Sequence, residues 1–152
     1  MKPWMKKTGV AVVVVALVYG LVFVDVMLRA RSAFYEGEKY WQWHEQPALK
    51  TAALDAWKAG EFKRLDRAVR RGKITDEDKT KQREIVEAEY ARRQKESAIK
   101  YAYIWYQTVV ELFTPPESPW SRSAREKMPR AKELWKQELT ARQVPFEEYM
   151  LE

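Results

Sequence analysis

The side chains that could support catalysis or metal binding are few. His44 is the only histidine and the chain has no cysteine, which removes disulfides, c-type haem attachment, Cys-based zinc sites and thiol nucleophiles. The Glu-x-x-His ligand pattern of helical di-iron bundles would need a glutamate where Trp41 stands. Glu45 alone is a weak co-ligand, so a polar or interfacial position for His44 is favoured.

The carboxylates between positions 84 and 89 are the next candidates for acid–base chemistry. Glu84, Glu87 and Glu89 lie among arginines at spacings that predict ion pairs along one helix. A catalytic pair needs a concave and partly dry setting, whereas this stretch is among the most charged of the chain. We therefore predict no enzymatic activity, no cofactor and no metal site.

A row of basic side chains precedes these carboxylates in the sequence, and it could meet anionic lipid or an acidic partner. The net charge is +6, but acidic residues alternate with basic ones, so a solvated face is the favoured interpretation. A nucleic-acid partner would need a cytoplasmic recognition fold, which the sequence does not indicate. The row consists of Lys63, Arg67, Arg70, Arg71 and Lys73.

Aromatic residues are unusually frequent, with seven Trp and eight Tyr. Tyr101, Tyr103, Trp105 and Tyr106 fall within one short stretch and must point in several directions around a helix. They predict either a core packed against the aromatics at 34–41 or a face that docks a partner. The last ten residues are also apolar and are expected to dock. The predicted partner-binding residues are Phe146, Tyr149, Met150, Tyr103 and Tyr106.

These residues must be positioned by a chain that begins with a hydrophobic segment. Residues 8–28 carry a single charge, Asp25, and as a helix they would be roughly 31 Å long, which matches the hydrocarbon core of a bilayer. A cleaved signal peptide is the alternative, but the apolar run is long for one and no clear A-x-A site follows. Residues expected at the membrane interface are Trp4, Asp25, Arg29 and Trp41.

Lysines before the span give a small positive-inside bias. We therefore expect a single-pass protein of the cell (inner) membrane, with a cytoplasmic N-terminus and an extracytoplasmic domain that is periplasmic in a Gram-negative cell. Residues 1–28 would be the start and anchor, and residues 29–152 the water-facing domain. Ala16 and Gly20 form a small-xxx-small pair that could seat another transmembrane helix.

The remaining residues predict an all-α fold. Glycine is scarce and no strand-like alternation occurs. The anchor helix is expected to continue to about His44, and a helical hairpin to span about 48–113. A C-terminal helix over about 129–142 and an apolar tail at 143–152 would follow.

Local signals mark the ends of these helices. Pro47 suits a first helical position, Gly72 a C-terminal stop, and Thr75 with Asp78 a capping box. From Thr75 the helix is expected to run unbroken to Phe113. Ser123 and Glu126 predict another capping box, and Pro129 predicts a break between a short helix and the C-terminal one.

The stretch from Phe62 to Glu84 resembles the SHOCT module, a short helix–turn–helix hairpin often appended to bacterial membrane proteins. The resemblance covers about a fifth of the chain and has Lys79 where the family has an aromatic residue. The same residues also suit any tight α-hairpin. The matching positions are Leu65, Gly72, Ile74, Thr75, Asp76 and Glu77.

A lone anchor, an apolar tail and many aromatics favour a non-catalytic function. We expect an accessory or assembly subunit that docks on a larger membrane protein complex, with the lipid bilayer and other subunits, or copies of itself, as partners. The alternative is an envelope sensor whose helical domain binds a small ligand.

Overall fold

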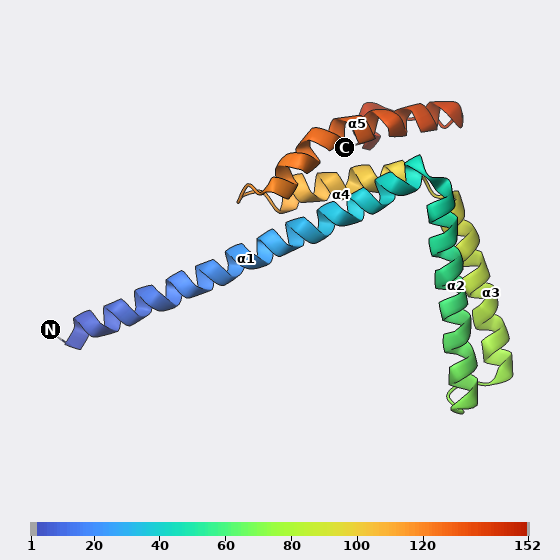
Figure 1. The fold of residues 1–152 in the computed structure, drawn as a ribbon, viewed down its shortest axis with the longest axis horizontal. Helices are drawn as coiled ribbons and strands as arrows, with labels where there is room; N and C mark the ends of the chain where they lie inside the picture. Colours follow the sequence, from blue (N-terminus) through green and yellow to red (C-terminus); the bar gives the residue numbers. More distant parts are fainter. Residues whose placement is uncertain (1–2, 152) are drawn as a thin grey trace. The chain divides into compact units, whose positions relative to one another are not determined.

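A computed structural model describes residues 3–151, with side chains from Val12 onward. All regular structure in this part of the chain is helical (Figure 1), which confirms the all-α prediction. Two compact units are formed, one by residues up to Lys39 with those from Lys100 on, the other by Tyr40–Ile99. The elements are α1 (Pro3–Glu45), α2 (Pro47–Arg70), α3 (Asp76–Lys95), α4 (Ala98–Leu112), α5 (Pro119–Ala141) and the 3₁₀ helix η1 (Glu148–Leu151).

Helix α1 changes its environment along its length. Every residue from Val12 to Asp25 is exposed. The helix from Val12 to Glu45 is, by length and composition, long and apolar enough to cross a membrane. A signal sequence would meet the same criterion. Burial begins at Val26, and further on Ala30, Ala33 and Gly37 form a buried stripe at helical spacing.

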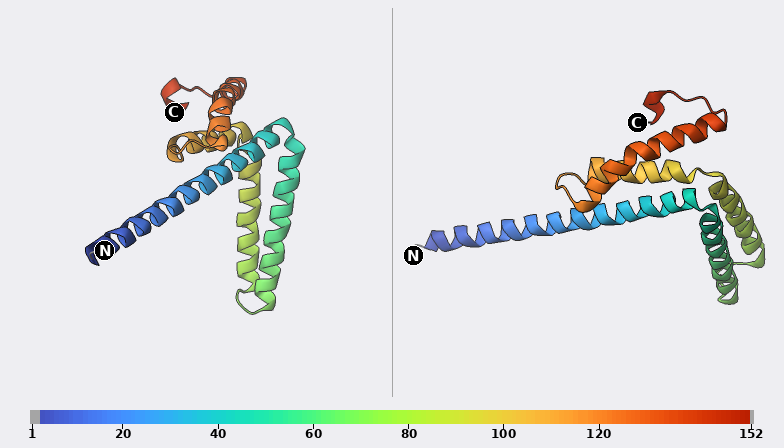
Figure 2. Two further views of the ribbon diagram at one scale, coloured as in Figure 1. Left: turned by 60° about the vertical axis from the view of Figure 1, so that its left-hand side comes forward. Right: turned by 45° about the horizontal axis from the view of Figure 1, so that its top comes forward.

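Small residues in that stripe allow α4 to approach α1 closely. A Cβ atom at Gly37 would lie 2.7 Å from Cε1 and 2.9 Å from Cδ1 of Tyr106, a side chain that is fully buried. Tyr106 also packs against Phe34, with ring centroids 5.9 Å apart. The two helices run in opposite directions side by side (Figures 1 and 2).

Helix α5 begins earlier than the sequence predicted. Its capping box joins Ser118 and Ser121, with Pro119 in the first turn, so the predicted box of Ser123 and Glu126 is wrong. Both serines are buried, and Ser121 Oγ accepts from the Ser118 N–H at 2.7 Å. This satisfies amides that would otherwise be buried without a partner.

The predicted break at Pro129 is also wrong, because α5 is one helix from Pro119 to Ala141. Pro129 is exposed. The carbonyl that loses its hydrogen bond, that of Arg125, therefore lies on a solvent-facing side where water can replace the missing donor. The buried face carries Ala124, Ala131 and Trp135.

In the second unit, α2 and α3 form an antiparallel hairpin whose ends follow the sequence signals. Pro47 lies in the first turn of α2. Gly72 has φ +64°, and the N–H groups of Gly72 and Lys73 donate to the carbonyls of Val69 and Ala68. This is a Schellman motif, which needs a residue tolerant of positive φ. Thr75 and Asp78 form the predicted capping box.

Within the two hairpin helices, which the structure describes in full, only Leu54 and Leu65 are buried, both on α2. Cations stacked on aromatic rings supply much of the remaining contact between the helices. Such contacts gain strength where water is partly excluded, so this interface depends on charged side chains more than a typical helical core does. The three stacked pairs are Lys58 on Tyr90, Arg83 on Phe62 and Arg93 on Trp57.

Helix α3 ends at Lys95, so the prediction of one unbroken helix to Phe113 is wrong. Glu96 is extended, with ψ 142°. The ammonium group of Lys50 donates to the carbonyls of Gln94 and Glu96 at 2.9 and 2.6 Å. A cation suits the negative end of a helix and satisfies carbonyls that lack an intrahelical partner.

We predict that Gly37→Ala destabilises the protein by about 1–3 kcal/mol, because the new methyl group overlaps a buried ring that has no room to move. Gly60→Ala is the matched control. It lies in α2, where an added methyl group would meet open space, and it should stabilise by about 0.5–1 kcal/mol. Thermal unfolding of the detergent-solubilised protein, followed by circular dichroism, measures both. Equal melting temperatures would contradict the close α1–α4 contact.

Candidate docking surface

The C-terminal segment folds back onto its own unit. Leu151 is 3% exposed, and its carbonyl accepts a hydrogen bond from the Tyr103 hydroxyl at 2.8 Å. The Tyr103 ring packs against Trp135 of α5, with centroids 5.8 Å apart. The segment is thus fixed at its end by the burial of one side chain and by one hydrogen bond to α4.

Two further features set the path of the segment. Gln143 has φ 55°, and the N–H groups of Gln143 and Val144 donate to the carbonyls of Thr140 and Leu139, which makes a Schellman turn after α5. Glu148 then pairs with Lys136 at 2.6 Å. The Lys136 hydrogen bond holds the pKa of Glu148 below its ordinary value, and Glu148 in turn raises the pKa of Lys136.

Three other apolar side chains of the segment face solvent. Tyr149 is 66% exposed, Met150 54% and Val144 45%, whereas Phe146 is half-buried. We call Val144, Tyr149 and Met150 the tail patch. Tyr and Met are enriched in protein interfaces relative to other surface, so these side chains have the chemistry expected of a docking site.

The predicted partner-binding residues Tyr103 and Tyr106 are placed differently. Tyr106 is fully buried, and its hydroxyl donates to Oε1 of Glu38 at 2.6 Å. Lys127 of α5 donates to both oxygens of Glu38 at 2.6 and 2.7 Å. Tyr103 is 5% exposed. Both tyrosines therefore lie in the interior of their unit, and we leave them out of the docking surface.

Three of the four predicted membrane-interface residues, Asp25, Arg29 and Trp41, form hydrogen bonds within α1. Trp4 has its side chain outside the described residues. Arg29 donates to Asp25 at 2.7 Å, which is the predicted i,i+4 pair. Trp41 is half-buried, and its indole N–H donates to Glu45 at 2.8 Å. In both hydrogen bonds the donor and the acceptor belong to α1 and lie four residues apart in the sequence.

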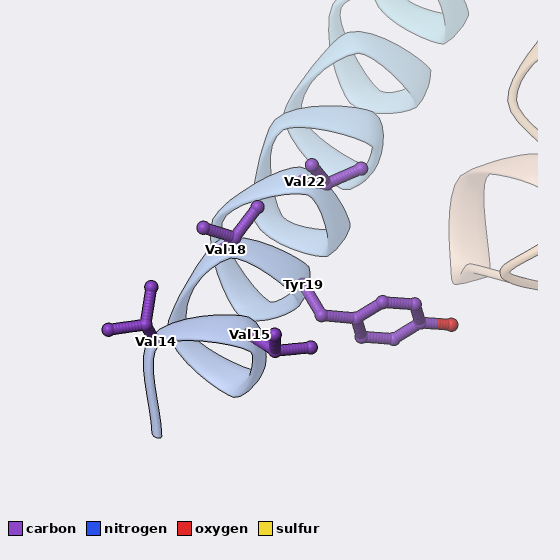
Figure 3. A pocket seen from close by; sticks show the side chains of 5 residues that line it. All are labelled: Val14, Val15, Val18, Tyr19 and Val22. Atoms are coloured by element: carbon purple, nitrogen blue, oxygen red, sulfur yellow. The ribbon is translucent and has the colours of Figure 1, made fainter. Parts of the chain in front are cut away.

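A shallow apolar hollow lies on α1 within the exposed segment. All of its lining residues belong to α1. Figure 3 shows the side chains projecting outward from that helix, those of Val14, Val15, Val18, Tyr19 and Val22. Tyr19 is 75% exposed. A surface of this kind, without walls from a second element, is the face that a helix offers to lipid or to another transmembrane helix.

Two of the three carboxylates at 84–89, Glu87 and Glu89, form ion pairs on the hairpin surface, and Glu84 is exposed. Glu89 pairs with Arg92 and Arg93, whose hydrogen bonds lower its pKa to about 2. Glu87 lies 3.6 Å from Lys58. Among residues 12–151, no group of three or more acidic, His or Cys side chains could hold a metal ion.

The basic row contributes to a shallow hollow near the hairpin tip. Three of its five predicted members, Arg67, Arg71 and Lys73, line this hollow together with Arg64 and Ala68.

The sequence prediction missed Leu151 and Lys136, which hold the C-terminal segment. The apolar character of residues 144–151 was the only signal for this arrangement. That signal did not distinguish the buried side chain from the exposed ones.

Comparison of the chain with family models, with curated proteins and with solved structures finds no match. The SHOCT resemblance therefore rests on the matching residues of the hairpin alone.

We predict that the Glu148 carboxyl titrates below its ordinary value of 4.5 and that Lys136→Met raises the midpoint toward that value. A depressed folded pKa contributes stability above the unfolded pKa, and this is lost as pH falls through the folded pKa. Protonation of Glu148 should therefore loosen the C-terminal segment in the wild type, whereas in the variant, where the folded and unfolded pKa values coincide, it should have no such effect. Carbon-13 NMR of the labelled carboxyl measures the midpoint. The same midpoint in both proteins would show that the pair does not form in solution.

Proposed function

We propose that this protein is a non-catalytic, single-pass membrane subunit that docks on a larger membrane protein complex through its C-terminal segment. The observation that carries the proposal is the tail patch, in which Tyr149 and Met150 are more than half exposed although the segment is fixed at Leu151. Fixing a segment in advance reduces the conformational entropy that its side chains lose on binding.

Burial of the tail patch against a protein partner would be favourable in free energy. Exposed side chains of Tyr and Met contribute little to the stability of their own unit, but burying them would remove apolar surface from water at about 25 cal/mol per Å². A small number of such residues commonly dominates the affinity of an interface. The half-buried Phe146 lies on the same segment and could extend the contact.

The anchor complements this patch. Residues 12–24 of α1 are exposed and carry no charge, so a membrane-embedded helix is the assignment that places them in a favourable solvent. An anchor confines the docking segment to a thin layer above the membrane. Its effective concentration toward another membrane protein then rises without any additional contact.

The pairing of the reactive side chains on the described surface supports a binding role. Glu87 and Glu89, two of the three carboxylates that the sequence offers for acid–base chemistry, are paired with lysine and arginine. For orientation, lysines precede the span, so we place the N-terminus in the cytoplasm and the helical units outside it.

We predict that Tyr149→Ser combined with Met150→Ser releases the partner and leaves the fold intact. Both side chains are exposed, so helix content and melting temperature should not change, whereas a hot-spot pair is expected to cost about 2 kcal/mol or more in association. Native electrophoresis of membranes in mild detergent should show the wild type in a large complex and the double variant outside it.

Ile85→Ser is the control for this experiment. Ile85 is 66% exposed on α3, so its replacement removes a comparable apolar side chain away from the tail patch. If the double variant remains in the complex, or if Ile85→Ser releases it equally well, the docking role of the tail patch is wrong.

We further predict that a reporter active only outside the cytoplasm is active when fused after Glu152. The lysine-rich start should keep the N-terminus inside, because positively charged loops resist translocation. A cytoplasmic reporter fused at the same position serves as the control. If only that second fusion is active, the proposed orientation is reversed.

A further inference from the structure

Helix α4 runs back along α1 toward the membrane-facing part of the same unit. Tyr106 packs at the level of Phe34 and Gly37, and the two helices are antiparallel (Figures 1 and 2). From Tyr106 to Leu112 the helix advances about 9 Å, so Leu112 lies close to the level of Leu28, the last apolar residue of the span.

The start of α5 returns to the same level. The guanidinium of Arg31 lies over the Trp120 ring, 6.0 Å from its centroid. On α1, Val26 and Met27 are half-buried and Ala30 is fully buried, so protein packing already covers one side of the last turn of the apolar segment. The link between α4 and α5 therefore lies beside the point where α1 would leave the bilayer.

Four apolar residues lie in this link or at its ends, beside the exposed acidic residues Glu111 and Glu117. Leu112 is 71% exposed, Pro115 is exposed, and Phe113 and Trp120 are half-buried. We call these four residues the turn patch. Leu112 and Pro115 contribute least to the core of the unit, because both are exposed. Aromatic residues at the edge of a span are typical of the headgroup layer.

We propose that the turn patch inserts into the headgroup layer of the bilayer next to α1, as a second membrane contact of this unit. The proposal rests on the membrane anchor of the proposed function, because continuity with the span is what identifies lipid as the occupant. Arg31 and Arg122 are both exposed, and the Arg31 guanidinium lies over the Trp120 ring. Their cationic groups suit lipid phosphates.

Two contacts with the membrane have a geometric consequence. A single helix leaves its extramembrane part free to rotate about the helix axis and to tilt. A patch that is held in the headgroup layer beside the helix fixes both, and it fixes which side of the unit faces neighbouring proteins. The tail patch would then be presented in one orientation relative to the membrane plane.

The test uses the full chain in phosphatidylcholine–phosphatidylglycerol vesicles. The chain lacks cysteine, so Leu112→Cys can carry a unique nitroxide spin label. We expect this label to collide more often with oxygen than with a water-soluble nickel chelate. The reference variants are Val18→Cys, expected to report the bilayer interior, and Gln137→Cys, exposed toward the far end of α5 and expected to report water.

A second measurement avoids the label. Lipids brominated near the headgroup should quench part of the tryptophan emission, and Trp120→Phe should remove a quenchable component. Trp135→Phe is the matched control, because Trp135 is only 9% exposed within the unit and its loss should leave the quenched component in place. Equal quenching in the Trp120→Phe variant and the wild type would overturn the proposal.

The outcomes separate this inference from the proposed anchor. If the Val18 label reports the bilayer interior and the Leu112 label resembles the Gln137 label, the anchor stands and the turn patch does not insert. If the Val18 label itself is aqueous, the anchor is wrong and the second contact fails with it.

Discussion

Tyr106 can pack where it does only because position 37 has no side chain. A methyl group there would come within 3 Å of two ring carbons, so glycine sets the distance between α1 and α4. The approach also brings the Tyr106 hydroxyl to Glu38, and Glu38 in turn binds Lys127 of α5. Three helices from distant parts of the sequence are thereby joined at one point. The remaining contacts of the unit, including those of Trp135 with Tyr103, build outward from this assembly.

Helix α1 is one continuous helix with two parts, an exposed apolar part and a part that packs against other helices. Its exposed apolar residues from Val12 to Asp25 suit lipid, while Ala30, Ala33 and Gly37 are buried against protein. The change occurs within two helical turns and is marked by the Asp25–Arg29 pair. The apolar segment and the buried stripe belong to one continuous helix. The packing of α4 and α5 on α1 therefore sets the distance of their side chains from the apolar segment.

Sequence reasoning succeeded where the determinant lies within a few residues along the chain. Pro47, Gly72 and the Thr75–Asp78 box mark helix ends by local backbone chemistry, and all three are confirmed. It failed where the determinant is distant. The end of α3 depends on Lys50, more than forty residues away, which binds the free carbonyls of Gln94 and Glu96. Pro129 is tolerated inside α5 because it faces solvent, a fact of tertiary structure that the proline itself does not reveal.

The C-terminal segment shows why the same limit applies to the candidate site. Its composition predicted docking, but a short 3₁₀ turn sends successive side chains in different directions, about three to a turn. Leu151 is therefore buried while its neighbours Tyr149 and Met150 are exposed. The Tyr103 hydroxyl donates to the Leu151 carbonyl and holds this end of the segment against α4. A hydrogen bond between residues 48 positions apart thus holds the segment whose exposed side chains form the tail patch.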